Sequence, residues 1–186
     1  GGNIFRGAAL QKAGLDRVAG DQMGMLATVM NGLAMRDELI RQGGKCVLMS
    51  AYGIPSISAQ YSAVAGRKAL EDGNVVIVAG GTGSPFFTTD TTAVLRAIEL
   101  KCDEVMKGTK VDGVYTADPV KDPSAVRYTS LSFNEVLASL RVSLSQLFII
   151  GSGHIIFFDC FEYVANSIQI VAVIIVNIYA TFFVVP

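Results

Sequence analysis

The sequence is poor in the residues that build metal sites, disulfide frameworks and nucleic-acid surfaces. It has one histidine, His154, so neither a histidine-based metal site nor a catalytic triad is expected. Its three cysteines, Cys46, Cys102 and Cys160, are far apart in a pattern that fits neither metal ligation nor disulfides, which favours a reducing compartment. The 15 basic and 16 acidic residues give a formal net charge of −1, which argues against a nucleic-acid partner.

The sequence also lacks the P-loop motif of many phosphate-binding proteins, and its last residues carry no charge. No Gly-x-x-x-x-Gly-Lys-Ser/Thr motif occurs, which excludes a P-loop kinase as far as this chain goes. No charged residue occurs from Tyr163 to Pro186. This stretch is long enough to span a bilayer, but amide side chains interrupt it, and its β-branched and aromatic residues suit strands as well as a helix.

The most informative segment present is a glycine-rich turn directly after a short apolar run. Residues 75–79 predict a buried strand of a parallel sheet, and Gly80, Gly81 and Gly83 follow at its carboxyl end. Ligands of parallel sheets collect at this end, and glycines let the backbone approach an anion, so a phosphate site is expected. The hydroxyl donors and the carboxylate that support this interpretation over an ordinary turn are Thr82, Ser84, Thr88, Thr89 and Asp90.

Helical and strand-like segments alternate along the first 140 residues. Strands are predicted at residues 45–49, 75–79 and 104–106, and helices at residues 60–72 and 91–100. Helices between strands imply an α/β fold with a mainly parallel sheet that is covered on both faces.

A long apolar helix precedes these elements. Asp21 is predicted to cap it, and it ends near residues 43–44. Its main apolar stripe consists of Met23, Leu26, Met30 and Leu33. Because Met25 and Val29 lie off that stripe, the helix is expected to be buried on a second side by a neighbouring subunit.

A second polar cluster, residues 107–119, follows the last of these strands. Tyr115 could lie against a nucleoside base, and the Asp118 carboxylate could accept a hydrogen bond from it. The alternative is an ordinary turn at residues 112–113 and an ordinary loop at residues 118–119.

Four segments carry a resemblance to a known family. They are Gly-Gly-Asn-Ile-Phe-Arg-Gly at residues 1–7, Gly-Asp-Gln-Met-Gly-Met-Leu-Ala-Thr-Val-Met-Asn at 20–31, Gly-Thr-Gly-Ser-Pro-Phe-Phe-Thr-Thr-Asp at 81–90, and Lys-Val-Asp-Gly-Val-Tyr-Thr-Ala-Asp-Pro at 110–119. In this order they resemble the bacterial uridylate kinases of the amino acid kinase family, over residues 1 to about 140.

The resemblance implies a three-layer α/β/α fold and a cytoplasmic homohexamer that phosphorylates UMP to UDP with ATP and Mg²⁺. It further implies activation by GTP and inhibition by UTP. Arg6 would reach the phosphates being exchanged, and Asp90 would lie near the transferring phosphoryl group. UMP binding is implied for Gly1, Asp21, Thr82, Gly83, Ser84, Pro85, Phe86, Phe87, Thr88 and Thr89, and ATP binding for Gly2, Arg6, Thr109, Tyr115 and Asp118.

The resemblance also predicts a fold that is incomplete at both ends. Residues 1–142 form the kinase-like domain, and residues 143–186 form an unmatched apolar tail whose loss of charge suggests out-of-frame translation. Family members begin with a strand and a lysine-bearing loop that this sequence does not contain, so an impaired kinase is expected. The alternatives are a non-catalytic fragment that binds nucleotide or pairs with subunits, and another member of the same family.

Overall fold

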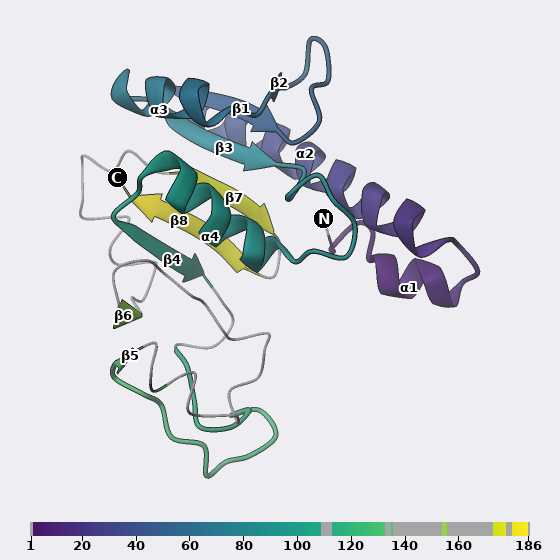
Figure 1. Cartoon of the computed structure of the whole chain (residues 1–186), viewed down its shortest axis with the longest axis vertical. Coiled ribbons are helices and arrows are strands. Elements are labelled where there is room, and N and C mark those ends of the chain that lie inside the picture. Colours follow the sequence, from purple (N-terminus) through teal and green to yellow (C-terminus); the bar gives the residue numbers. More distant parts are fainter. Residues whose placement is uncertain are drawn as a thin grey trace.

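The computed structural model describes residues 2–108, 113–132, 135, 154–155, 173–177 and 180–185 (Figure 1). Its helices are α1 (Gly7–Lys12), α2 (Arg17–Arg41), α3 (Ala63–Glu71) and α4 (Thr89–Leu100). Its strands are β1 (Cys46–Ser50), β2 (Ala59–Gln60), β3 (Val75–Ala79), β4 (Glu104–Gly108), β5 (Leu131–Ser132), β6 (His154–Ile155), β7 (Val173–Asn177) and β8 (Ala180–Val185). The predicted strands at 45–49, 75–79 and 104–106 are therefore present within a residue or two of their expected bounds.

The main sheet has six strands in the order β2-β1-β3-β7-β8-β4. Strand β1 pairs in parallel with β2 and β3, and β3 pairs in parallel with β7. Strand β8 runs antiparallel to both β7 and β4. The mainly parallel α/β sheet expected from the sequence is thus confirmed.

Helices cover both faces of this sheet. Along β3, Val76 and Val78 pack in one hydrophobic cluster with residues of α3 and α4, whereas Ile77 and Ala79 pack in another with Val29 of α2. Figure 1 shows α3 and α4 on the near side of the sheet and α2 behind it. Alternate side chains of a strand point to opposite faces, so the continuous apolar run of β3 fills both cores of a three-layer α/β/α arrangement.

Helix α2 begins earlier than the sequence suggests. Its N-cap is Asp16, whose carboxylate accepts hydrogen bonds from the backbone N–H groups of Val18 (3.0 Å) and Ala19 (3.2 Å). The prediction that Asp21 is the cap is wrong, because Asp21 lies inside the helix. Both aspartates precede the apolar residues, and tertiary contacts give Asp21 a different role, described below.

The buried face of α2 also differs from the predicted stripe. Val29 is 3% exposed and lies against the sheet, whereas Leu26 and Met30 are 46% and 56% exposed. Gly32 allows the close approach, because a Cβ atom there would lie 2.8 Å from Leu48 Cδ1. The described chain thus leaves one apolar side of α2 uncovered, and its burial by another subunit stays a prediction.

Helices α3 and α4 have N-caps that shift their predicted starts. Ser62 caps α3, so this helix begins at Ala63 and Gln60 belongs to β2 instead. Thr88 caps α4, which begins at Thr89, two residues before the predicted start.

A polar cluster joins α4 to Tyr61, which lies just before α3. The guanidinium of Arg96 lies 2.7 Å from Glu99 Oε2 and 4.0 Å from the centroid of the Tyr61 ring. The Tyr61 hydroxyl donates to the same Glu99 oxygen at 2.8 Å. Burial, followed by the Glu99 carboxylate, raises the pKa of Tyr61 above its usual value, so this hydroxyl remains a donor at neutral pH. The contacts hold the helix that carries Asp90.

The C-terminal stretch contributes strands wherever its structure is described. Residues 173–177 and 180–185 are β7 and β8 of the main sheet. Among the described residues, no helix combines the length and the apolar character needed to cross a bilayer.

Candidate functional site

The strongest candidate site is the glycine loop, residues 80–88, which joins β3 to α4. Gly80, Gly81 and Gly83 have φ angles of +79°, +60° and +83°, in the left-handed region that favours glycine. Phe86 adopts φ +69° without being a glycine, so surrounding contacts must hold it there. The loop begins at the carboxyl end of β3, as the sequence predicts, and Ala51 at the end of neighbouring β1 donates to Ala79 O at 3.0 Å.

Two side chains from other elements support the base of this loop. The Thr28 hydroxyl of α2 accepts from Gly80 N at 2.7 Å and donates to Met25 O at 2.6 Å. The Tyr52 hydroxyl donates to Gly83 O at 2.8 Å. The sequence analysis missed both residues. Tyr52 lies two positions after β1, so it is at the carboxyl ends of the parallel strands, where the loop also lies.

Replacing Thr28 by valine tests this support. Thr28 is 7% exposed, so Thr28→Val leaves the Gly80 N–H buried without its acceptor. The expected loss of unfolding free energy is about 1–3 kcal/mol, the usual cost of a buried unpaired donor. Urea denaturation of both variants measures it, with Thr28→Ser as the matched control because it keeps the hydroxyl. Equal stability of the valine and serine variants would contradict this role.

Hydroxyl groups shape the rest of the loop. Thr82 Oγ accepts from Ser84 N at 3.1 Å, and Thr88 Oγ accepts from Thr91 N at 3.2 Å as the cap of α4. Asp90 lies in the first turn of α4. A helix N-terminus carries unpaired N–H groups and partial positive charge, which favour a phosphate group. The predicted hydroxyl-rich helix start is therefore present, with Thr88 as its cap, and Thr82 shapes the loop before it.

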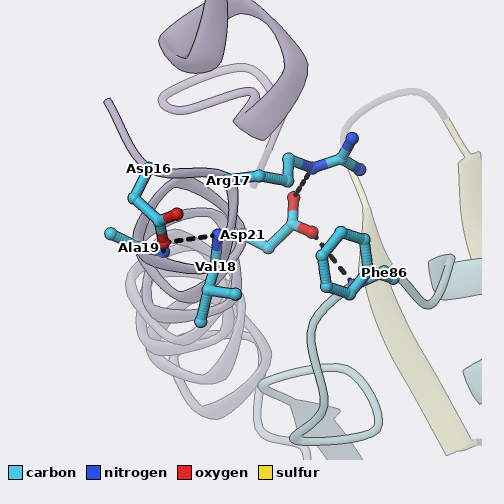
Figure 2. A network of polar contacts seen from close by, with 6 residues as sticks. All are labelled: Asp16, Arg17, Val18, Ala19, Asp21 and Phe86. Atoms are coloured by element: carbon cyan, nitrogen blue, oxygen red, sulfur yellow. Dashed lines mark hydrogen bonds and ion pairs between the residues drawn. The ribbon is translucent and has the colours of Figure 1, made fainter. Parts of the chain in front are cut away.

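Asp21 joins α2 to the tip of the glycine loop (Figure 2). Its Oδ2 atom accepts from Phe86 N at 3.0 Å, and its Oδ1 atom accepts from Arg17 Nε at 2.9 Å. The guanidinium carbon of Arg17 lies 5.4 Å from the centroid of the Phe86 ring. The structure thus brings Asp21 together with the loop expected to enclose UMP, and it adds Arg17, which the sequence did not single out.

The segment before α1 packs on the same part of α2. A Cβ atom on Gly7 would lie 2.1 Å from Asp21 Oδ1, and one on Gly20 would lie 3.1 Å from Gly7 Cα. A Cβ atom on Gly24 would lie 3.3 Å from Phe5 O. The glycines of the first two motifs therefore allow two backbone segments to touch.

This packing fixes the position of the segment that carries Arg6 against α2. Arg6 is the exposed N-cap residue of α1, directly before Gly7. Asn3 and Asn31 exchange side-chain hydrogen bonds of 3.4 and 3.1 Å, which fix the start of the segment against α2. Gly2 is half-buried, and Gly1 lies outside the described residues.

The second predicted cluster lies elsewhere. Figure 1 shows residues 113–132 beyond β4, at the edge of the main sheet opposite β2. Asp118 makes local contacts, accepting from Val120 N at 3.0 Å and lying 3.4 Å from Lys121 Nζ. Tyr115 forms an isolated antiparallel bridge with Arg127. Thr109 lies outside the described residues, so the ATP assignment for this cluster stays a prediction.

Other reactive groups fall outside the loop. Burial, with a smaller contribution from Asp103, raises the pKa of Cys102 to about 11, so its thiol stays protonated at neutral pH. In the described part of the chain, no three His, Cys, Asp or Glu side chains gather in a way that could hold a metal ion.

Comparison with known proteins points to one family. The model of the amino acid kinase family matches residues 1–175. A uridylate kinase of Saccharophagus degradans is 58% identical over 137 residues, which cover 74% of this chain and 56% of that protein. A uridylate kinase of Alcanivorax borkumensis is 59% identical over 137 residues, with 74% and 54% covered. The chain therefore spans about half the length of these curated relatives.

Solved structures agree with the fold. The crystal structure of UMP kinase from Ureaplasma parvum has a TM-score of 0.71 and 32% identity, covering 96% of this chain and 70% of that one. UMP kinase from Bacillus anthracis has a TM-score of 0.71 and 29% identity, covering 95% and 67%.

Proposed function

The chain belongs to the amino acid kinase family, and we propose that it binds UMP at the glycine loop and takes part in phosphoryl transfer from ATP to UMP. The observation that carries the proposal is the glycine loop itself, which joins β3 to the start of α4 and whose tip is held by Asp21. Relatives named uridylate kinases, at 58–59% identity over 137 residues, support UMP as the acceptor.

The chemistry of phosphoryl transfer fits these parts. Such a reaction needs alignment of two oxygen atoms and stabilisation of negative charge more than it needs a covalent group on the protein. In the proposal, the glycine loop and the N-terminus of α4 hold the acceptor phosphate. Arg6, exposed beside the contact between Gly7 and Asp21, supplies a planar cation that can contact two phosphate oxygens.

ATP would arrive as its magnesium complex. Mg²⁺ in kinases is usually held by one or two carboxylates together with the substrate phosphates. Asp90, in the first turn of α4, is the carboxylate that we place near the transferring phosphoryl group. Thr109, Tyr115 and Asp118 are the proposed contacts to the donor nucleotide.

Assembly and control belong to the same proposal. The exposed Leu26 and Met30 on α2 offer an apolar surface to a second subunit, which supports a homo-oligomer such as the hexamer implied by the family. Activation by GTP, inhibition by UTP and a cytoplasmic location are further predictions from the resemblance.

Two measurements on the whole chain test the function. Calorimetric titration measures UMP binding, with AMP as the comparison, and a second assay follows UDP formation from UMP and Mg-ATP. Arg6→Ala is expected to lower any UDP formation by about 10²–10³-fold, the usual effect of removing a group that stabilises transition-state charge. Arg41→Ala is the matched control, because Arg41 is an exposed arginine at the far end of α2 that pairs with Glu38.

The possible outcomes separate the alternatives. UMP binding together with UDP formation supports a kinase. UMP binding without UDP formation supports the non-catalytic, nucleotide-binding alternative. Absence of UMP binding would overturn the assignment of the acceptor.

A further inference from the structure

We propose that Arg17 is a positioning residue for the acceptor nucleotide, because it holds Asp21 and Phe86 so that the glycine loop is formed before the nucleotide binds. That Arg17 orders the glycine loop is argued from contacts in the structure. That this ordering favours nucleotide binding rests on the proposed function. Arg17 has no phosphate or base contact in the proposal, so it acts through its two neighbours.

The first step is the fixed orientation of the Asp21 carboxylate. The side chain is 16% exposed and uses its two oxygens in different directions. Oδ1 accepts from Arg17 Nε at 2.9 Å, one helical turn earlier on α2, and Oδ2 accepts from Phe86 N at 3.0 Å. Figure 2 shows the carboxylate lying between these two donors. Removing the guanidinium would free the carboxylate to rotate away from the loop.

The second step is the backbone of Phe86. Its φ of +69° is unfavourable for a residue with a side chain, so the loop needs external contacts to keep this conformation. The residue is 67% exposed and therefore has little core packing to hold it. The hydrogen bond to Asp21 and the guanidinium of Arg17, 5.4 Å from the ring centroid, are two such contacts.

Arg17 thus acts on the loop by two routes at once. It orients the carboxylate that binds the Phe86 backbone, and it lies over the ring of the same residue. Loops that are ordered in advance bind ligands more tightly, because the ordering cost is not incurred on binding. We therefore expect loss of Arg17 to weaken UMP binding while leaving ATP binding and the fold unchanged.

The test combines a loop measurement with a ligand measurement. Hydrogen exchange of the Phe86 amide in the ligand-free chain is expected to be about five- to tenfold faster in Arg17→Ala than in the unmodified chain. The dissociation constant for UMP should rise by a similar factor, about five- to tenfold, while that for ATP stays unchanged. Arg17→Lys keeps the charge but lacks the planar group, so intermediate values are expected.

Arg41→Ala serves as the control, since it removes another arginine of α2 that pairs with a carboxylate on its own helix. It should leave both measurements unchanged, and thermal melts of all variants should stay close to that of the unmodified chain. Unchanged Phe86 exchange in Arg17→Ala would overturn the inference, as would an equal loss of UMP and ATP affinity. If exchange accelerates but the unmodified chain binds no UMP, the control of the loop by Arg17 stands and the proposed function fails.

Discussion

Gly80→Ala is expected to destabilise the protein by about 2–5 kcal/mol and to abolish the proposed binding of UMP at the glycine loop. The φ of +79° costs an alanine about 1–2 kcal/mol. The new methyl group would lie 2.9 Å from Ser50 Oγ and 3.0 Å from Ala51 N, and such overpacking costs about 1–3 kcal/mol. Ala51 directly follows β1, and its backbone cannot move away without breaking the hydrogen bond from Ala51 N to Ala79 O.

Gly73→Ala is the matched control for this variant. Gly73 has φ +78°, but a Cβ atom there would meet nothing within 4 Å. The two variants share the backbone strain and the change in unfolded-chain entropy, so their difference isolates the crowding at Gly80. Urea denaturation of both chains, followed by UMP titration, measures it. Equal losses of stability would show that crowding at Ser50 and Ala51 is absent.

Removal of residues 173–186 is expected to abolish cooperative folding. In the sheet order β2-β1-β3-β7-β8-β4, strand β4 reaches the remaining strands only through β7 and β8. β7 also pairs with Val76, Ile77 and Val78, which are at most 1% exposed. Without β7 and β8, the central strand β3 becomes an edge strand and β4 loses its pairing partner.

The expected effect is large because all backbone hydrogen bonds of β7 and β8 with β3 and β4 are lost. Each backbone hydrogen bond contributes about 0.5–1.5 kcal/mol net, and domains of this kind are stable by about 5–15 kcal/mol in total. A chain ending at residue 172 should show a broad thermal transition and bind a hydrophobic dye, whereas a control that lacks only Pro186 should melt sharply. A sharp melt of the shortened chain would contradict the pairing of β7 with β3, and would support a boundary of the folded domain near residue 142.

Both predictions concern the support of the glycine loop. Gly80 lies at the carboxyl end of β3, and β7 covers the side of β3 that β1 does not. A site on a turn between a strand and a helix is only as rigid as the sheet that carries it. We therefore expect stability and UMP binding to fall together in these two variants, in contrast to Arg17→Ala.

The sequence by itself determined the local features of this protein. The apolar run of residues 75–79 predicted β3, and the glycines after it predicted the turn, because a continuous β-branched run suits a strand covered on both faces and positive φ angles need glycine. The alternation of helices and strands predicted the mainly parallel α/β fold. The motifs identified the family before any geometry was known.

Only the tertiary structure decided which residues meet. The sequence predicted Asp21 as the cap of α2, but the cap is Asp16. Asp21 lies inside the helix, where its carboxylate accepts from Phe86 N, 65 positions away. Thr28 carries no local signal for supporting a distant turn, and only the place of Tyr52 just after β1 hints at its role. Arg17 lies before the predicted start of the helix and was not singled out. Hydrophobic periodicity shows which residues tend to be buried, whereas polar contacts between distant segments depend on how the elements pack, which no local pattern encodes.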